Sequence, residues 1–374
     1  MLGRGIKLFR VLGIQISVDY TWFIIFIFFA WTLAYGYFPY MNPGLDRRVY
    51  LGMGFFSSLA LFACVLIHEL SHSYTSNRLG LEIKEITLFI FGGVAQLTRE
   101  PDRASDELKI AVAGPIASGV LAGLFYVAWR LIDPEAHVVA SAIVKYLAII
   151  NLVLLIFNLI PGFPLDGGRV LRAIWWWKTG DFERATRLTS RIGKLFALFL
   201  IITGFMRIFT GNFIGGLWSV LIGVFLQQAA ESGYRQVVMK LALEGVKVRD
   251  IMARDVVSMD ASETVATAVE RYFLPHHYVS FPVLSDSRVV GLLTLNNVRA
   301  VPKDEWETTS VRDVMHGIEA TDVLSPDDAA EGVLGRMTGD NLGRFPVVED
   351  GELKGIVTRR DIMRVMQFKT ELKR

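Results

Sequence analysis

The sequence is poor in cysteine and in charge, and both shortages narrow the classes of protein to consider. Cys64 is the only cysteine among 374 residues, which excludes an internal disulfide framework and suits a reducing cytosol or a lipid-buried thiol. Charged residues make up 20% of the chain, and the formal net charge is +2. The cations form no continuous basic stripe, so nucleic acid is not an expected partner.

Apolar residues, by contrast, are abundant. They account for 52% of the chain, and the mean hydropathy is +0.40, whereas soluble proteins of this size usually lie near or below zero. The excess lies in residues 1–230, where long apolar runs dominate, and residues 231–374 have the composition of an ordinary soluble domain. We therefore expect the first part of the chain to lie in a lipid bilayer.

A helix needs about 17 to 25 apolar residues to cross a bilayer. Six segments are candidates, at residues 20–37, 52–74, 108–131, 138–159, 195–209 and 213–226. The fifth is the shortest, and the last two also fit a tight hairpin. Residues 81–97 are too short and too glycine-broken to span, and they predict a strand, a turn at Gly92-Gly93 and a second strand, together a re-entrant β-hairpin.

The start of the chain and its cations predict a topology. The basic N-terminus precedes an apolar run without a small-x-small cleavage site, which favours an uncleaved first membrane helix over a signal peptide. Lysine and arginine crowd the segment before the first span and the loops after the second and the fourth. By the positive-inside rule, this bias predicts six spans in the cell membrane with both termini in the cytoplasm.

The soluble part contains an internal repeat. VKVRDIM at 246–252 recurs as TSVRDVM at 309–315, and the 281–299 segment beginning FPV recurs at 345–363. Each copy predicts a helix, a strand, a polar turn, a second strand and a closing helix. The expected organisation is a membrane domain at 1–230, a linker at 231–245, and two α/β repeats at 246–305 and 306–374.

The sequence HELSH, from His68 to His72, ends the second apolar segment. Residues four apart share one face of a helix, so His68 and His72 can hold one metal ion, and Glu69 stands beside them as a candidate general base. The alternative is a chance match. Three ionisable groups at membrane depth are costly unless they bind or react, which favours a metal site over a chance match. We expect this active site to lie within the membrane, toward the cytoplasmic side.

Two histidines do not complete a zinc site, so a third protein ligand must come from elsewhere. Asp166 is the best candidate near the membrane, in the sequence NLIPGFPLDGGR that follows the fourth span. Prolines and glycines break the helix there, and such backbone at membrane depth is tolerated where it lines a cavity. The plain alternative is a cytosolic turn in which Asp166 caps a helix.

The pattern HELSH on a membrane helix, followed by N-x-x-P-x-x-P-L-D-G-G, resembles the site-2 protease family of intramembrane zinc proteases. The resemblance implies one zinc ion per chain, with His68, His72 and Asp166 as ligands. It also implies Glu69 as general base and a hydrogen bond from Asn158 to the substrate or the developing oxyanion. The expected partner is a transmembrane protein substrate.

Two further stretches, FGGVAQL and the Ala-Gly-Pro at 113–115, also resemble elements of this family. Ser118 departs from it, because the family often has asparagine at that position, and its role stays open. The hairpin containing Gly92 and Gly93 is expected to present an extended substrate segment by strand addition, with a passive plug beside the metal as the alternative.

The repeat resembles a pair of CBS domains, which often bind adenine nucleotides and which can also form homodimers. In that pattern Thr358 and Asp361 would contact a nucleotide such as ATP, ADP or AMP. Thr294 matches in the first copy, where Asn297 replaces the aspartate. The alternative is that these residues only cap helices at strand ends.

The function predicted from these features is intramembrane zinc proteolysis of membrane proteins, modulated by nucleotide. Two rivals stay open. A different membrane zinc peptidase would keep HExxH but leave the PLDGG element without a purpose. A nucleotide-gated transporter or channel would explain the CBS pair, but it predicts charged pairs along a pore.

Overall fold

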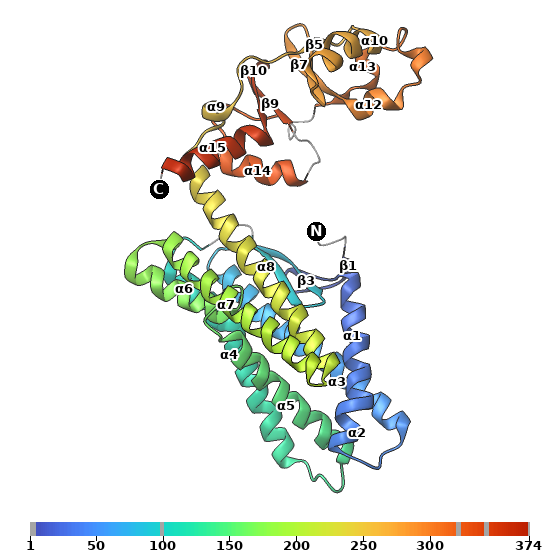
Figure 1. Cartoon of the computed structure of the whole chain (residues 1–374), viewed down its shortest axis with the longest axis vertical. Helices are drawn as coiled ribbons and strands as arrows, with labels where there is room; N and C mark the ends of the chain where they lie inside the picture. Colours follow the sequence, from blue (N-terminus) through green and yellow to red (C-terminus); the bar gives the residue numbers. More distant parts are fainter. Residues whose placement is uncertain (1–4, 98–100, 319–322, 340–343, 373–374) are drawn as a thin grey trace. The chain divides into compact units, whose positions relative to one another are not determined.

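The computed structural model describes residues 5–97, 101–318, 323–339 and 344–372. The chain divides into two compact units, Met1–Arg235 and Gln236–Arg374 (Figure 1). The division falls inside helix α8, Phe213–Leu243. The segment expected as a linker, 231–245, is therefore mostly the end of this helix.

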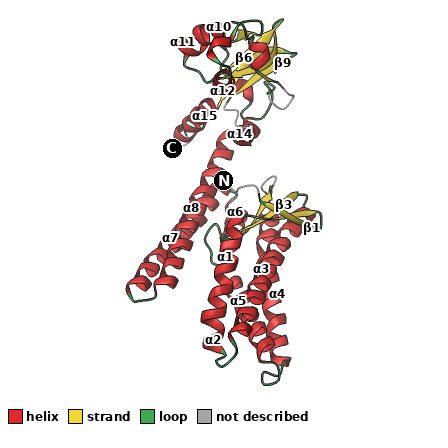
Figure 2. Cartoon of the chain, turned by 90° about the vertical axis from the view of Figure 1, so that its right-hand side faces the viewer, coloured by secondary structure: helices red, strands yellow, loops and turns green. Residues whose placement is uncertain are grey.

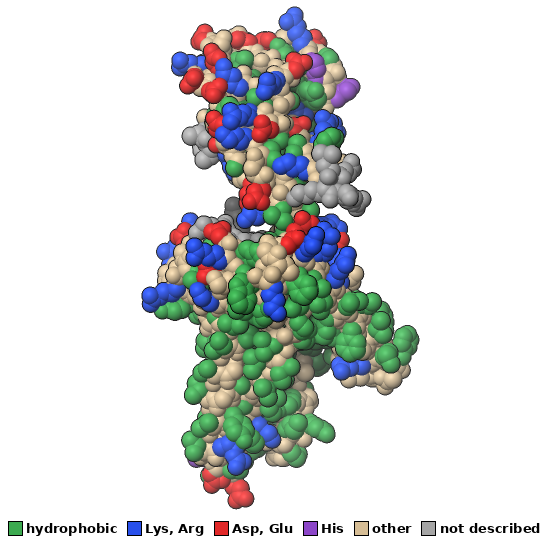
Figure 3. Space-filling model, turned by 90° about the vertical axis from the view of Figure 1, so that its left-hand side faces the viewer, with side chains coloured by type: hydrophobic (Ala, Val, Ile, Leu, Met, Phe, Trp, Pro, Cys, Tyr) green, Lys and Arg blue, Asp and Glu red, His purple; other side chains and the backbone are tan. Residues whose placement is uncertain are grey.

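Six helices of the described chain are long and apolar enough to cross a membrane, as the sequence predicts. They are Tyr20–Met41 (α1 with α2), Arg47–Arg78 (α3), Ala104–Leu131 (α4), Val138–Asn158 (α5), Phe182–Phe209 (α7) and Phe213–Leu243 (α8). Their outer faces are apolar: on α7, Leu195 is 67% exposed and Phe199 58%. Figure 3 shows how widely hydrophobic side chains cover this unit. Such a surface belongs in lipid.

The first span is a composite. Helix α1 (Tyr20–Thr32) passes through one π-helical turn, Leu33–Tyr37, into the short α2 (Phe38–Met41). It begins at Asp19, whose side chain accepts a hydrogen bond from the Thr21 amide at 2.9 Å. Asp46 caps α3 in the same way, at 2.8 Å from the Arg48 amide. Both helices thus start at an aspartate that satisfies otherwise unpaired amides.

A four-stranded sheet completes the first unit, in the order β1-β2-β3-β4. Its strands are β1 (Ile6–Val11), β2 (Ile14–Val18), β3 (Ile83–Phe89) and β4 (Gly92–Leu97). Strand β2 runs parallel to β3, and the other pairs are antiparallel. The β3–β4 hairpin agrees with the sequence-based expectation, whereas the N-terminal hairpin β1–β2 was not anticipated. Figure 2 shows the sheet at one end of the helices.

The sheet packs directly on the helix that carries HELSH. Ile14, Ile16, Ile83 and Ile86 are at most 3% exposed and contact Leu66 and Leu70 of α3. These two leucines flank His68 in the sequence. The apolar contact therefore fixes the sheet beside the histidines.

The turn of the β3–β4 hairpin lies two residues earlier than the sequence suggested. Phe89 pairs with Gly92, so Ile90 and Phe91 form the loop and Gly92-Gly93 begin β4. The expected Gly-Gly turn is therefore wrong. Gly92 has a φ of 131°, which only glycine adopts readily, so its conformation is required in the strand rather than in the turn.

Between the fourth and fifth spans the chain forms a short extra helix, α6 (Asp166–Thr179), which is not long enough to be counted as a span. The preceding loop is tied to α7 by a hydrogen bond from the Phe163 amide to the Thr189 carbonyl at 3.1 Å. Helices α7 and α8 pack closely through small residues, because a Cβ at Gly204 would lie 2.8 Å from the Gly216 carbonyl oxygen. The last two spans thus form a tight hairpin of two full-length helices.

The second unit contains the two repeats. The first comprises α9 (Val248–Ile251), β5 (Met259–Asp260), α10 (Val265–Ala268), a π-helical turn (Val269–Phe273), α11 (Leu274–His276), β6 (Ser280–Ser285), β7 (Arg288–Thr294), α12 (Leu295–Ala300) and a 3-10 turn (Lys303–Glu305). The second comprises α13 (Val311–Val314), β8 (His316–Gly317), α14 (Ala330–Gly339), β9 (Arg344–Glu349), β10 (Glu352–Thr358) and α15 (Arg359–Leu372). This is the predicted helix, strand, turn, strand and helix, present twice.

One sheet joins the repeats, in the order β5-β6-β7-β10-β9, with β8 added against β7. The unit has two cores, one around Phe281 and the other around Phe345, both at most 1% exposed. The repeats exchange their first helices between these cores, because Val248 of α9 packs in the Phe345 core and Val311 of α13 in the Phe281 core. The polar turns take positive φ angles, for example 51° at Asp286 and 86° at Gly351. The two repeats thus share the same turn conformation at the same position, so the repeat is visible in the structure as well as in the sequence.

Candidate metal centre

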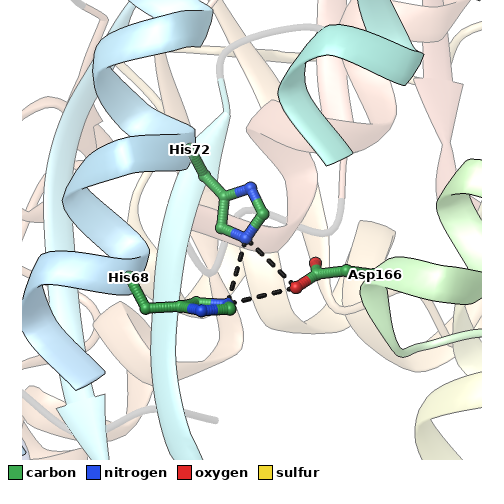
Figure 4. A group of neighbouring side chains, drawn as sticks. All are labelled: His68, His72 and Asp166. Atoms are coloured by element: carbon green, nitrogen blue, oxygen red, sulfur yellow. Dashed lines mark hydrogen bonds and ion pairs between the residues drawn. The ribbon is translucent and has the colours of Figure 1, made fainter. Parts of the chain in front are cut away.

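Helix α3 places His68 and His72 one turn apart on its inner face, where each residue is 6% exposed. Asp166 is the first residue of α6 and is 8% exposed. Figure 4 shows the three side chains pointing at one another. Asp166 Oδ2 lies 3.1 Å from His68 Nε2 and 3.2 Å from His72 Nε2, and the two Nε2 atoms lie 3.2 Å apart.

These three atoms form a nearly equilateral triangle that fits one metal ion. Donors about 2.0–2.2 Å from a tetrahedral zinc ion lie about 3.3–3.5 Å from one another, close to the distances found here. Two imidazole nitrogens and one carboxylate are a donor set that zinc accepts. Among the described residues this is the one group of three or more histidine, cysteine or acidic side chains arranged to hold a metal.

The outward nitrogens of both imidazoles contact α4. His72 Nδ1 lies 2.6 Å from the Ile110 carbonyl oxygen, which can only accept, so Nδ1 carries the proton and Nε2 presents its lone pair to the triangle. His68 Nδ1 lies 2.9 Å from the Ser118 hydroxyl. In this tautomer Nε2 of His72 is free to act as a metal ligand, as the geometry of the triangle requires.

Gly114 explains how α4 comes so close. A Cβ at this position would lie 2.6 Å from His68 Nε2 and would also collide with His72 Nε2. Any side chain would displace an imidazole, so the helix needs glycine where it crosses the histidines. Ser118 is one turn further along α4. At this position the sequence departs from the site-2 protease pattern, and the Ser118 hydroxyl contacts the imidazole of His68 and orients it.

Glu69 lies between the histidines and strand β4. Its side chain is half-buried, and a Cβ added at Gly93 would lie 2.5 Å from Glu69 Cγ. The backbone of the edge strand therefore passes in van der Waals contact with the carboxylate-bearing side chain. Asn158, the remaining residue expected in the site, is the half-buried last residue of α5, where the chain enters the segment that leads to Asp166.

The residues singled out in the repeats form matched helix caps. Asp361 Oδ2 accepts from the Thr358 amide at 2.9 Å and from its hydroxyl at 2.6 Å. In the first repeat Asn297 Oδ1 accepts from the Thr294 amide at 3.1 Å. The helix caps that the sequence offered as the alternative are therefore formed in both copies. A side chain that caps a helix can also contact a ligand, so these caps do not exclude a nucleotide site.

Arg344 and Tyr278, at the junction of the repeats, went unnoticed in the sequence. Arg344 of the second repeat reaches the first, with its guanidinium 4.6 Å from the Tyr278 ring centroid and its Nη1 3.3 Å from the Ser280 carbonyl oxygen. The pKa of Arg344 lies below its ordinary value, mainly because burial disfavours the charged guanidinium, and interactions with Tyr278 and Asp361 only partly offset this. Comparing the two copies could have found Arg344, because it precedes FPV where the first copy has Ser280.

Comparisons with known proteins agree with both halves of the chain. The family model described as "Peptidase family M50" matches residues 56–134 and 133–200. The model described as "CBS domain" matches residues 248–304 and 311–367. The chain is 32% identical to Rip3 of Mycobacterium tuberculosis over 367 residues, covering 97% of this chain and 93% of that protein. It is 31% identical over 375 residues to a zinc metalloprotease of Methanocaldococcus jannaschii, with 100% of both chains covered.

A solved structure, the site-2 protease of Methanocaldococcus jannaschii, matches with a TM-score of 0.42 and 30% identity over 61% of this chain and 94% of that chain. The six long apolar helices and the curated relatives define the class as a multi-pass membrane zinc metalloprotease. Within that class the chain belongs to peptidase family M50, the site-2 proteases, and it carries a CBS-domain pair after its membrane spans.

The contact between Ser118 and His68 predicts a loss of metal affinity without a loss of fold. Replacing an outer partner of a metal-bound histidine typically weakens metal binding by about 10–100-fold. Ser118→Ala should therefore raise the zinc dissociation constant by about tenfold or more, measured by chelator competition in detergent. Ser57→Ala, a change at a fully buried hydroxyl nearer the N-terminus of α3, is the control and should leave it unchanged. Equal affinities in both variants would contradict the role of Ser118.

Proposed function

We propose that this protein is an intramembrane zinc endopeptidase that cleaves transmembrane or membrane-adjacent segments of other membrane proteins. The observation that carries the proposal is the His68, His72 and Asp166 triangle with Glu69 beside it and an edge strand against Glu69. A metal site alone would fit many proteins. A metal site next to a base and a strand edge fits peptide hydrolysis.

His68, His72 and Asp166 would hold one zinc ion, and Glu69 would move protons. When bound, zinc acts as a Lewis acid that polarises a carbonyl and makes water nucleophilic near neutral pH. Glu69 accepts the proton of the attacking water and passes it to the amine that leaves when the C–N bond breaks. Asn158 is the proposed hydrogen-bond donor to the substrate carbonyl, a role that rests on family resemblance.

Strand β4 would present the substrate. A peptide bond inside a transmembrane helix is shielded by the surrounding turns, so a substrate must unwind before attack. Strand β4 lies at the edge of the sheet and has β3 as its partner on one side, so an extended segment can add to its other side. The contact between Gly93 and Glu69 means that a segment added there lies near the base.

The proposed orientation has both termini in the cytoplasm and the metal site toward the cytoplasmic side. Helix α6, between α5 and α7, contains Arg169, Arg172 and Lys178, and the first turns of α7 contain Arg184 and Arg187. The opposite ends of the spans contain fewer cations. His68 and His72 lie in the half of α3 nearer to this basic side, which supports the assignment.

The CBS pair would bind an adenine nucleotide at the junction of the repeats. A carboxylate at Asp361 can accept hydrogen bonds from ribose hydroxyls, and the Arg344 guanidinium suits a phosphate. The Tyr278 ring under that guanidinium offers a surface for stacking. Membership of a peptidase family favours a regulator of proteolysis over a gate of transport.

Substitutions at Glu69 and Asp166 should separate the general base from the metal ligands. Glu69→Gln should keep about one zinc per chain and lose cleavage of a model membrane substrate by at least about a hundredfold, because general base catalysis typically contributes that much. Asp166→Ala should instead lower zinc occupancy. Asp181→Ala is a strict control, since it removes a carboxylate that caps α7 and should still leave zinc bound. Near-parental turnover in Glu69→Gln would exclude the assignment.

A further prediction tests strand β4. Gly92→Val forces a branched residue into a φ of 131°, whereas its Cβ meets nothing within 4 Å, so the strain falls on the strand backbone. We expect about tenfold slower cleavage of an intact membrane substrate with zinc affinity unchanged. Gly13→Val, with a φ of 81° in the β1–β2 turn at the far side of the same sheet, is the matched control. Equal rates for both variants would make the hairpin a passive plug.

Another prediction concerns the nucleotide. Calorimetry on the full chain in detergent should show that Asp361→Ala weakens adenine nucleotide binding by about tenfold, since charge-assisted hydrogen bonds are roughly twice as strong as neutral ones. Asn297→Ala should change it little. Both variants remove a helix cap, so effects on folding are matched. The reverse order would contradict the site, and no binding by the parent would recast the pair as a dimerisation module.

A further inference from the structure

One buried ion pair has no part in the chemistry described above. Glu107, in the first turn of α4, is 0% exposed, and Arg172 of α6 is 5% exposed. Both Nε and Nη2 of Arg172 donate to the same oxygen of Glu107, Oε1, with the Nε contact at 2.7 Å. Within the described residues the second oxygen, Oε2, has no hydrogen-bond partner.

Aromatic rings hold the guanidinium in place. Its central carbon lies 5.5 Å from the Phe163 ring centroid and 4.9 Å from that of Phe182. Phe163 belongs to the loop that leads to Asp166, and Phe182 is the first residue of α7. Arg172 therefore joins four segments at one point: α4, the loop before α6, α6 itself and α7.

The position of this pair relates it to the metal centre. Helix α4 carries Glu107 and, one turn later, the Ile110 carbonyl that accepts from His72. The same helix carries Ser118, the partner of His68. Helix α6 carries Arg172 and begins with Asp166. The ion pair thus connects the helix that orients both imidazoles with the helix that supplies the carboxylate.

We propose that the Glu107–Arg172 ion pair is a positioning device for the metal site, which holds α4 against α6 so that Asp166 Oδ2 lies at ligand distance from both histidines. Within the described part of the chain, the polar contacts of Glu107 and Arg172 do not include the atoms of the metal triangle, so both residues would act through the helices. The proposal rests on the metal site proposed above. A buried ion pair is weak evidence for stability, because apolar replacements are often equally stable, so a geometric purpose explains its presence better.

The test measures zinc affinity and stability separately. The zinc dissociation constant of the full chain in detergent is determined by chelator competition, and the apo protein's thermal midpoint is recorded. Glu107→Gln and Arg172→Lys should each weaken zinc binding by about tenfold, the lower end of the range for outer partners of metal ligands. Lysine keeps the charge of Arg172 but lacks the planar fork and the ring stacking. Asp106→Asn, in the exposed pair with Lys109 on the same helix, is the control and should leave zinc affinity unchanged.

The double variant Glu107→Leu with Arg172→Met separates positioning from folding. It removes both charges, so the apo protein should keep its thermal midpoint, yet zinc should still bind about tenfold more weakly. The absorption spectrum of bound cobalt(II) should also shift, because it reports ligand geometry. Parental zinc affinity and cobalt spectrum in the double variant would overturn the proposal. A parent that binds no zinc would overturn the metal site itself, whereas a zinc-binding parent with an unchanged Glu107→Gln overturns the ion-pair role alone.

Discussion

The membrane half of this protein depends on one electrostatic constraint, the convergence of two imidazoles and a carboxylate within 3.2 Å inside an apolar helical bundle. Burying such groups is costly unless each polar atom is paired and the shared negative charge is compensated. A single divalent cation at the centre of the triangle satisfies all three donors at once. The need to pair these buried groups is the physical reason for proposing a metal site here.

The position of the two imidazoles restricts which residues helix α4 can have where it crosses α3. Helix α4 must approach α3 closely enough for a backbone carbonyl to accept from His72, which requires glycine at position 114. It must also offer a polar side chain to His68, which Ser118 supplies. Serine and asparagine can both hydrogen-bond to an imidazole nitrogen, so the departure from the family pattern at this position is compatible with the same contact.

Local periodicity explains why part of this was predictable. HELSH on a helix specifies that His68 and His72 share a face, and long apolar runs specify the six spans. Asp166 could be predicted as the third ligand because few other residues near the membrane can bind a metal. The N-terminal hairpin β1–β2 is a local pairing that the apolar-run analysis overlooked. The parallel pairing of β2 with β3, as of Ile16 with Ile86, was not accessible because it joins residues far apart in the chain. The turn at Ile90 and Phe91 was missed for a related reason, because glycines suggested a turn where the register with β3 begins a strand.

The proposed nucleotide site of the CBS pair also combines contacts that are local in the sequence with contacts that are distant. In each repeat the capping residues are three positions apart and readable from the sequence, whereas Arg344 joins the repeats by contacts with Tyr278 and Ser280 that only the fold reveals. A nucleotide bound at that junction, as proposed above, would contact residues of both repeats. Helix α8 contributes to both units of the chain, with Leu226 in the core of the first and Leu243 in the core of the second. A change at the repeats can affect proteolysis only by as much as the nucleotide's affinity differs between two arrangements of the chain. A nucleotide that binds both arrangements equally would stabilise the CBS pair and leave the metal site unaffected.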